Sequence, residues 1–171
     1  MRVVNVGDTT PQVSLAPDRL QALVRTALAL DDKTPAYVWV DGDSELALHA
    51  DQSRVALVPG AIIVGLAVEC DQTGAAEVTV PFAVGAKGVD AGMVMSAPGR
   101  PDGPPTVVDR WGAVLLAAAY RAVLDVVTAA AATAGVDRDG QPLIPGAMTT
   151  DGKTLAITPQ ARHAIDRGRL L

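Results

Sequence analysis

A long apolar run extends over residues 110–134, RWGAVLLAAAYRAVLDVVTAAAATA, and after its first residue its only charges are Arg121 and Asp125. These two residues are four positions apart, so they lie on one narrow stripe of a helix. A helix that is apolar on its other sides must be covered by protein or by lipid. We therefore predict a largely buried helix, with Asp109 as its N-cap and Gly135 as its C-terminal stop.

The length of this segment would also suit a membrane span, since about 20 apolar residues cross a bilayer. Its two charges lie in the middle, however, and alanine contributes little to membrane insertion. The N-terminal residues MRVVNVGDTTPQVSL hold Asn5, Gly7 and Asp8 where a signal peptide needs an unbroken apolar stretch. We therefore expect a cytoplasmic protein without a membrane span.

A shorter amphipathic helix is predicted near the N-terminus, from Pro17 to about Leu30. Proline suits the first helical position, and Asp18 is favourable beside the positive end of the helix dipole. The apolar residues of this segment share one face, as expected for a helix packed on a core. They are Leu20, Leu23, Val24, Ala27 and Leu28.

Apolar and polar residues alternate between residues 36 and 85, as in half-buried strands, with turn residues between the segments. We predict an antiparallel meander of about four or five strands, in which Asp51 to Ser53 form one of the turns. Pro81 cannot donate a ladder hydrogen bond, so its strand should lie at an edge or carry a bulge. The predicted strands are 36–40, 45–50, 54–58, 61–70 and 76–85.

Glycine and proline recur through residues 85–108, which we predict to be a long loop with an extra short strand at residues 93–95. Loops of more than about 12–15 residues are unusual in compact domains and are often functional. After the long helix, we predict a hairpin around Gly152 and a short final helix over residues 159–168, capped by Thr158.

This order of elements predicts a single α+β domain over residues 1–171, because the helices stand apart from the run of strands. The expected architecture is an N-terminal helix, the meander, the long helix packed on the sheet, and a C-terminal hairpin with a short helix. We treat residues 136–171 as a C-terminal appendage. A chain of this length can bury roughly 70% of its unfolded surface without disulfides or metal.

Composition narrows the classes of partner. Hydrophobic residues make up 49% of the chain but aromatic residues only 3%, so aliphatic side chains must build the core. The net charge of −5, with no basic cluster before the last few residues, argues against nucleic acid as a main partner. Cys70 is the only cysteine and therefore forms no internal disulfide, and we expect its thiol to be buried.

Acidic residues gather around the first predicted hairpin, at Asp41, Asp43, Glu45 and Asp51, with His49 between them. Such a set could bind a hard divalent cation or act in acid–base chemistry. Asp-Gly is also preferred in tight hairpin turns, and Glu45 and His49 fall on the face expected to meet solvent. No calcium-loop spacing follows. We predict no metal, with Asp41, Asp43, Glu45 and His49 as the candidates if one binds.

The sequence motifs that would indicate phosphate binding or nucleophilic catalysis are incomplete. The glycines around Lys87 could cradle a phosphate group, but the P-loop spacing is missing and no helix follows directly. The two histidines, His49 and His163, lie outside any recognisable nucleophile motif. We therefore expect no cofactor, and the sequence favours a protein that is not an enzyme.

The C-terminal stretch TTDGKTLAITPQARHAID resembles the wing hairpin and following helix of winged-helix DNA-binding proteins. The resemblance implies DNA binding through this hairpin and helix, and it covers this stretch alone. The preceding segments do not supply three short helices with a basic recognition helix, and the acidic net charge is unfavourable. DNA binding is therefore the third of our hypotheses.

The first hypothesis is a non-catalytic structural, assembly or adaptor subunit that acts through protein–protein contacts, in the first place as a homo-oligomer and otherwise with another protein, in which the long apolar helix and an exposed sheet edge complete their burial. It rests on the apolar surface of the long helix, whose alanines permit close helix contact. The second is a small-molecule-binding protein or small enzyme with an apolar pocket beneath the 85–108 loop. Its candidate ligand-binding residues are Lys87, Arg100, Tyr120, Arg121 and Asp125.

Overall fold

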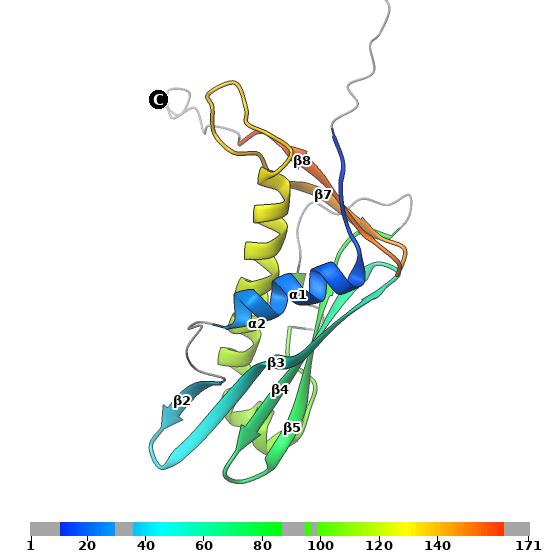
Figure 1. Ribbon diagram of the computed structural model, residues 1–171. Helices are drawn as coiled ribbons and strands as arrows, with labels where there is room; N and C mark the ends of the chain where they lie inside the picture. Colours follow the sequence, from blue (N-terminus) through cyan, green and yellow to red (C-terminus); the bar gives the residue numbers. More distant parts are fainter. Residues whose placement is uncertain (1–10, 30–35, 87–94, 97–98, 163–171) are drawn as a thin grey trace, which may run out of the picture.

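The computed structural model of the chain describes residues 11–29, 36–86, 95–96 and 99–162. Figure 1 shows two sheets arranged along one long helix, α2, with a shorter helix, α1, crossing it. The predicted α+β class is confirmed. The elements are β1 (Val13–Leu15), α1 (Pro17–Leu28), β2 (Tyr37–Asp41), β3 (Ser44–Val58), β4 (Ala61–Cys70), β5 (Gly74–Ala83), β6 (Met95–Ser96), α2 (Pro105–Ala132), β7 (Ile144–Thr150) and β8 (Leu155–Gln160).

The larger sheet is an antiparallel meander in the order β2-β3-β4-β5-β6. It confirms the predicted run of strands. A short extra strand is also present at Met95 and Ser96, which pair with Ala83 and Phe82 of β5. It overlaps the predicted strand 93–95 at Met95, and residues 93 and 94 lie outside the described residues. Cys70, at the end of β4, is buried as expected.

Pro81 lies near the edge of this sheet, as the sequence predicts. Two residues before it, the N–H of Thr79 points away from β4 and donates to the Asp102 carbonyl at 2.7 Å. Alternate residues of a strand direct their N–H groups to the same side. A backbone N–H at position 81 would therefore point away from β4, toward the side on which few residues of β5 are paired. Proline at this position thus removes no hydrogen bond between β4 and β5.

The predicted turn at residues 51–53 is wrong. β3 is one long strand with a bulge, where its register against β4 shifts between His49 and Arg54. The buried hydroxyl of Ser53 donates to the His49 carbonyl at 2.9 Å and accepts the Ala67 N–H at 3.2 Å. The Ser53 side chain thus provides hydrogen-bond partners for backbone groups that the bulge leaves out of the β3–β4 ladder. The polar residues 51–53 therefore bend a continuous strand and do not end it.

A second sheet joins the first and the last described strands, in the order β1-β8-β7. The predicted hairpin is confirmed, since β7 and β8 pair on either side of Gly152. In the turn of this hairpin, the Asp151 carboxylate accepts hydrogen bonds from the backbone N–H groups of Lys153 and Thr154. These bonds lower the pKa of Asp151 below its usual value. The pairing of β8 with the N-terminal strand β1 was not expected from the sequence.

The predicted C-terminal helix is not seen. Thr158 and Pro159, which were expected to cap and begin it, instead continue β8. Leu155, Ile157 and Pro159 are buried at alternate positions, which is the period of a strand. Tertiary burial of this alternating pattern therefore prevails over the local Thr-Pro signal for a helix start. Residues 163–168 of the predicted helix lie outside the described residues.

Helix α2 begins earlier than predicted, at Pro105, so Asp109 lies in its second turn and is not the N-cap. Pro104 and Pro105 set the start, because the fixed φ of proline suits the first turn, where a backbone N–H would find no acceptor within the helix. The predicted end is close to the observed one. The helix ends at Ala132, and Gly135 follows with a φ of 134°, which favours glycine.

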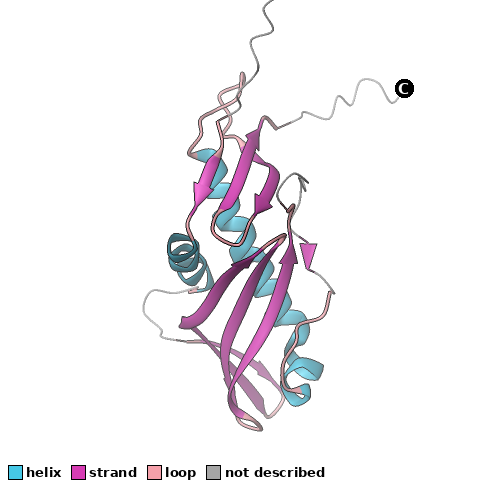
Figure 2. Ribbon diagram, turned by 90° about the vertical axis from the view of Figure 1, so that its right-hand side faces the viewer, coloured by secondary structure: helices cyan, strands magenta, loops and turns pink. Residues whose placement is uncertain are grey.

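Helix α2 spans both sheets. Figure 2 shows it running behind the larger and the smaller sheet, and it packs on β4, β5, β7 and β8 as well as on α1. Within the described residues, α2 is the one helix whose length and hydropathy would suit a membrane span, and core helices of soluble proteins meet the same criteria. Its buried residues are Val107, Val108, Trp111, Gly112, Leu115, Ala119, Ala122, Val123, Val126, Val127, Ala130 and Ala131.

Candidate interaction surface

Strand β2 forms one edge of the larger sheet and, among the described residues, pairs only with β3. Its outer valines are accessible, with Val38 46% and Val40 65% exposed. Asp41, at its end, is the one charged residue of the strand. Edge strands in soluble proteins generally carry charges, prolines or bulges that oppose further pairing. The centre of β2 has none of these, so it is open to another strand.

The backbone groups that face this open edge belong to Val38 and Val40. β2 and β3 are joined by a two-residue turn with Gly42, at a φ of 59°, in its first position. The two residues that flank such a turn, here Asp41 and Ser44, form a hydrogen-bonded pair. Going back along β2 from Asp41, non-bonded and hydrogen-bonded pairs with β3 then alternate. The N–H and C=O of Trp39 therefore point toward β3, whereas those of the two valines point outward.

An apolar groove, which we call the β2 groove, lies between β2 and α2 on the helix side of the sheet. It encloses about 270 Å³, and its walls include Tyr37 and Trp39 of β2 together with Ala117, Ala118 and Arg121 of α2. The two aromatic rings meet edge to face, with 4.8 Å between their centroids. Among the described residues of the lining, Arg121 is the one charged side chain. The described walls of the groove are therefore apolar apart from this cation.

The exposed side of α2 extends beyond this groove. Arg121 and Asp125 are each 60% exposed, and Arg121 Nε lies 3.9 Å from Asp125 Oδ2. The polar stripe that the sequence indicates is thus at the surface. Between Ala113 and Ala129, exposed residues recur at every fourth position of α2, and three of the five are alanine, which lets another backbone approach the helix closely. They are Ala113, Ala117, Arg121, Asp125 and Ala129.

A second groove, which we call the α1 groove, lies between β1, α1 and the last turns of α2. It encloses about 500 Å³. Leu15, Leu23 and Val126 contribute apolar walls, and Arg19 and Asp125 are its charged lining residues. This size and lining suit an apolar small molecule with a polar end.

Arg110 of α2 holds the β2–β3 hairpin against the helix. Its Nε donates to Asp41 Oδ2 at 2.9 Å, and its Nη1 donates to the Ser44 hydroxyl at 2.7 Å. Its guanidinium carbon also lies 5.5 Å from the centroid of the Trp111 ring, within cation–π range. These contacts give β2 a fixed position although it pairs with a single described strand.

Among the predicted ligand-binding residues that the structure describes, Arg121 and Asp125 are the two in contact with each other. Each of them lines a different groove. Lys87 lies outside the described residues. The other two have separate partners: Arg100 forms an ion pair with Asp109, and Tyr120 packs its ring at 6.2 Å from that of Phe82.

The acidic residues of the β2–β3 hairpin are separated from one another. Asp41 accepts the hydrogen bond from α2 described above, and His49 Nε2 faces Glu69 Oε2 of β4 at 3.4 Å. Asp43 and Glu45 are exposed. Within the described part of the chain, no group of three or more His, Cys, Asp or Glu side chains could hold a metal ion.

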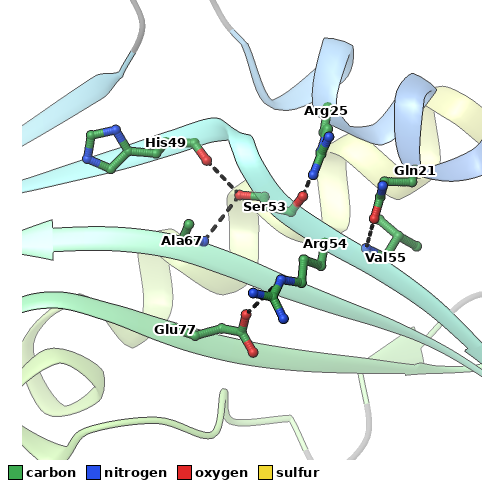
Figure 3. Close-up of polar contacts among 8 residues, drawn as sticks. All are labelled: Gln21, Arg25, His49, Ser53, Arg54, Val55, Ala67 and Glu77. Carbon is green, nitrogen blue, oxygen red and sulfur yellow. Dashed lines mark hydrogen bonds and ion pairs between the residues drawn. The ribbon is translucent and has the colours of Figure 1, made fainter. Parts of the chain in front are cut away.

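The bulge of β3 is tied to α1 by hydrogen bonds between side chains and backbone (Figure 3). Arg25 Nε donates to the Ser53 carbonyl at 2.7 Å, and Gln21 Oε1 accepts the Val55 N–H at 3.2 Å. Helix α1 contributes residues to both grooves. The bulge therefore has a positioning role, because it fixes the helix that borders the two concave surfaces.

The sequence predicts the strand at 36–40 and an exposed sheet edge, but it does not assign that edge to this strand. A signal was available, because the first strand of a meander has a neighbour on one side only, and β2 is apolar on both faces at Val38, Trp39 and Val40. The anchoring role of Arg110 had no such signal. Its partner Asp41 is 69 residues away, and no local pattern links the two.

No protein-family model, curated protein or solved structure matches this chain. Its function has to be inferred from its own surface, which offers an open apolar strand, two grooves and an exposed row of small residues on α2.

Proposed function

We propose that the protein is a non-catalytic structural or assembly subunit that associates with copies of itself through β2 and the β2 groove. The observation that carries this proposal is the open edge of β2. Val38 and Val40 there combine exposed apolar side chains with outward-facing backbone hydrogen-bonding groups. A strand edge of this kind is a template for pairing with another strand.

The β2 groove supports the same function because it continues the contact surface onto α2. A strand added beside β2 would also lie next to Ala117 and Ala118, where the lining is small and apolar. Stable interfaces bury about 800 Å² on each partner, more than one short strand supplies. The groove and the exposed row of α2 offer the additional area.

Val40→Lys is expected to weaken self-association at least about tenfold, because a lysine on an edge strand opposes pairing with another strand. Val58→Lys is the matched control, since Val58 is a 40% exposed valine of the same sheet that lies on β3, away from the open edge. Sedimentation over a range of concentrations measures the mass against the 17.5 kDa of one chain.

A wild-type protein that keeps the mass of a single chain at every concentration would overturn the proposal. An equal loss of association in the Val40→Lys and Val58→Lys proteins would also overturn it, because the contact would then not depend on the edge of β2.

A second candidate function is the binding of an apolar small molecule in the α1 groove. Its volume of about 500 Å³ and its apolar walls favour this function. The groove is formed by β1, α1 and α2, so it differs in place from the pocket beneath the 85–108 loop that the sequence suggests.

Ala129→Trp is expected to weaken the binding of an apolar fluorescent dye, anilinonaphthalene sulfonate, at least about tenfold, because the indole would fill the α1 groove. Ala129 is exposed and lines this groove, so the variant should fold. Ala75→Trp, at an exposed position of β5, is the control. Equal dye affinity in the two variants, or no binding by the wild type, would contradict this candidate function.

A further inference from the structure

We infer that β2 of a second copy pairs antiparallel with β2, about a twofold axis at Trp39, so that the two larger sheets become one. This inference rests on the proposed function and adds to it the partner strand, its direction and its register. The twofold axis is normal to the sheet, and both copies of α2 therefore lie on the same face of the joined sheet.

The backbone groups of β2 fit this register. Val38 lies opposite Val40 of the second copy, and the outward N–H and C=O groups of both residues find partners as hydrogen-bonded pairs. Trp39 lies opposite its own copy in a non-bonded pair, where side chains approach most closely. Registers shifted by two residues would still pair the outward groups, but they would leave one end of Tyr37–Asp41 without an opposing residue of β2.

The side chains of the strand are also self-complementary. On the face away from α2, Val38 and Val40 meet the valines of the second copy, which covers the exposed apolar side chains of the edge. On the helix face, the Trp39 rings of the two copies come together beside the Tyr37–Trp39 pairs. Aromatic pairs contribute about 0.5–1.5 kcal/mol beyond their buried area.

Charge favours a second copy as the occupant. In this register Asp41 of the second copy lies opposite Tyr37, which lines the β2 groove together with the cationic side chain of Arg121. The Asp41 side chain is on the helix side of the strand, as its bond from Arg110 shows. β2 has no other charged residue, so the pairing sets no like charges directly opposite each other.

Single cysteines test the register directly. Val38→Cys and Val40→Cys proteins, both in a Cys70→Ala background, are mixed under mild oxidation, and linked dimers are quantified on non-reducing gels. Opposite residues of a hydrogen-bonded pair have Cα atoms about 5.5 Å apart, within the range of a disulfide, whereas diagonal neighbours are about 7–8 Å apart. The mixture is therefore expected to yield at least about tenfold more linked dimer than either protein alone.

Val58→Cys, mixed with either protein, is the control and should give only background linkage. If Val38→Cys or Val40→Cys links to itself as strongly as the mixture does, the register is overturned. If the mixture gives no linkage, the strand pairing is overturned. If the wild-type protein still associates after either of these results, the proposed self-association is retained and only the inferred β2 pairing is wrong. If the wild-type protein is a monomer, the proposed function and the inferred pairing are both wrong.

Hydrogen exchange of the wild-type protein provides a test that needs no substitution. On raising the protein concentration, the amides of Val38 and Val40 should become protected, because they gain carbonyl partners. Trp39 should change little, because its amide already faces β3. Unchanged exchange at both valines in the associated protein would overturn the inference.

Discussion

Phe82→Ala is expected to lower the free energy of unfolding by about 3–5 kcal/mol, the largest effect that we predict. Phe82 is fully buried in β5, and its ring lies 6.2 Å from that of Tyr120 on α2. It is the only phenylalanine of the chain, and the core around it is mostly aliphatic. Truncation would leave a cavity between sheet and helix, visible as a lower urea midpoint followed by tryptophan fluorescence.

Phe82→Leu is the matched control, because leucine keeps much of the apolar volume. We expect it to cost about 1–1.5 kcal/mol. A loss below about 1 kcal/mol for Phe82→Ala would contradict the close packing of β5 against α2, since a well-packed aromatic residue cannot be removed so cheaply.

Ser53→Ala is expected to lower the free energy of unfolding by about 2–4 kcal/mol, because it leaves two partly buried backbone groups without their partner, at about 1–2 kcal/mol each. Those groups are the His49 carbonyl and the Ala67 N–H, and Ser53 itself is only 1% exposed. Arg25 binds the carbonyl of the same residue, so a loosened bulge would also weaken the attachment of α1 (Figure 3). Urea unfolding measures the loss.

Thr26→Ala is the control for this prediction. The hydroxyl of Thr26 also bonds a backbone carbonyl, that of Ala22 at 3.0 Å, but at an exposed position where water can replace it. We expect a change within about 0.5 kcal/mol. In Ser53→Ala the Ala67 amide should exchange faster with solvent. An unchanged rate at Ala67 would mean that its N–H keeps a partner, and the predicted cost would be wrong.

The helices and most strands could be predicted because their patterns are local. The apolar face of α1 and the apolar run of α2 specify helices by their period, and Pro17 marks the first helical residue in the structure as in the sequence. The start of α2 was missed because two prolines at 104 and 105 are a stronger start signal than the single carboxylate of Asp109.

The two errors in the strands have one cause. Residues 51–53 have the composition of a turn, and Thr158 and Pro159 have that of a helix start, yet both segments lie within strands. In each case long-range partners decide. Ser53 pairs with groups of β3 and β4, and β8 is held between β1 and β7. Propensity is a weak prior that such tertiary contacts override.

The candidate interaction surface was only partly predictable. An apolar strand at 36–40 and an Arg121–Asp125 stripe on a long helix are visible in the sequence, and the structure describes both. The sequence does not show that β2 and α2 line one groove, because residues of its two walls, such as Trp39 and Ala117, are far apart along the chain. The helix itself was expected to be exposed mainly along its charges, but three of the five residues in its exposed row, Ala113 to Ala129, are alanine.

The sequence by itself determined the α+β class, the order from α1 through the meander to α2 and the β7–β8 hairpin, and the buried side of α1, because these follow from periodicity within single segments. Tertiary structure alone decided that the strands β1 and β8 share a sheet, that the polar run at 51–53 bends a strand, and that β2 is an open edge beside a groove. These features depend on which segments pair across long separations. Such pairing is set by the combined burial and hydrogen bonding of the whole chain.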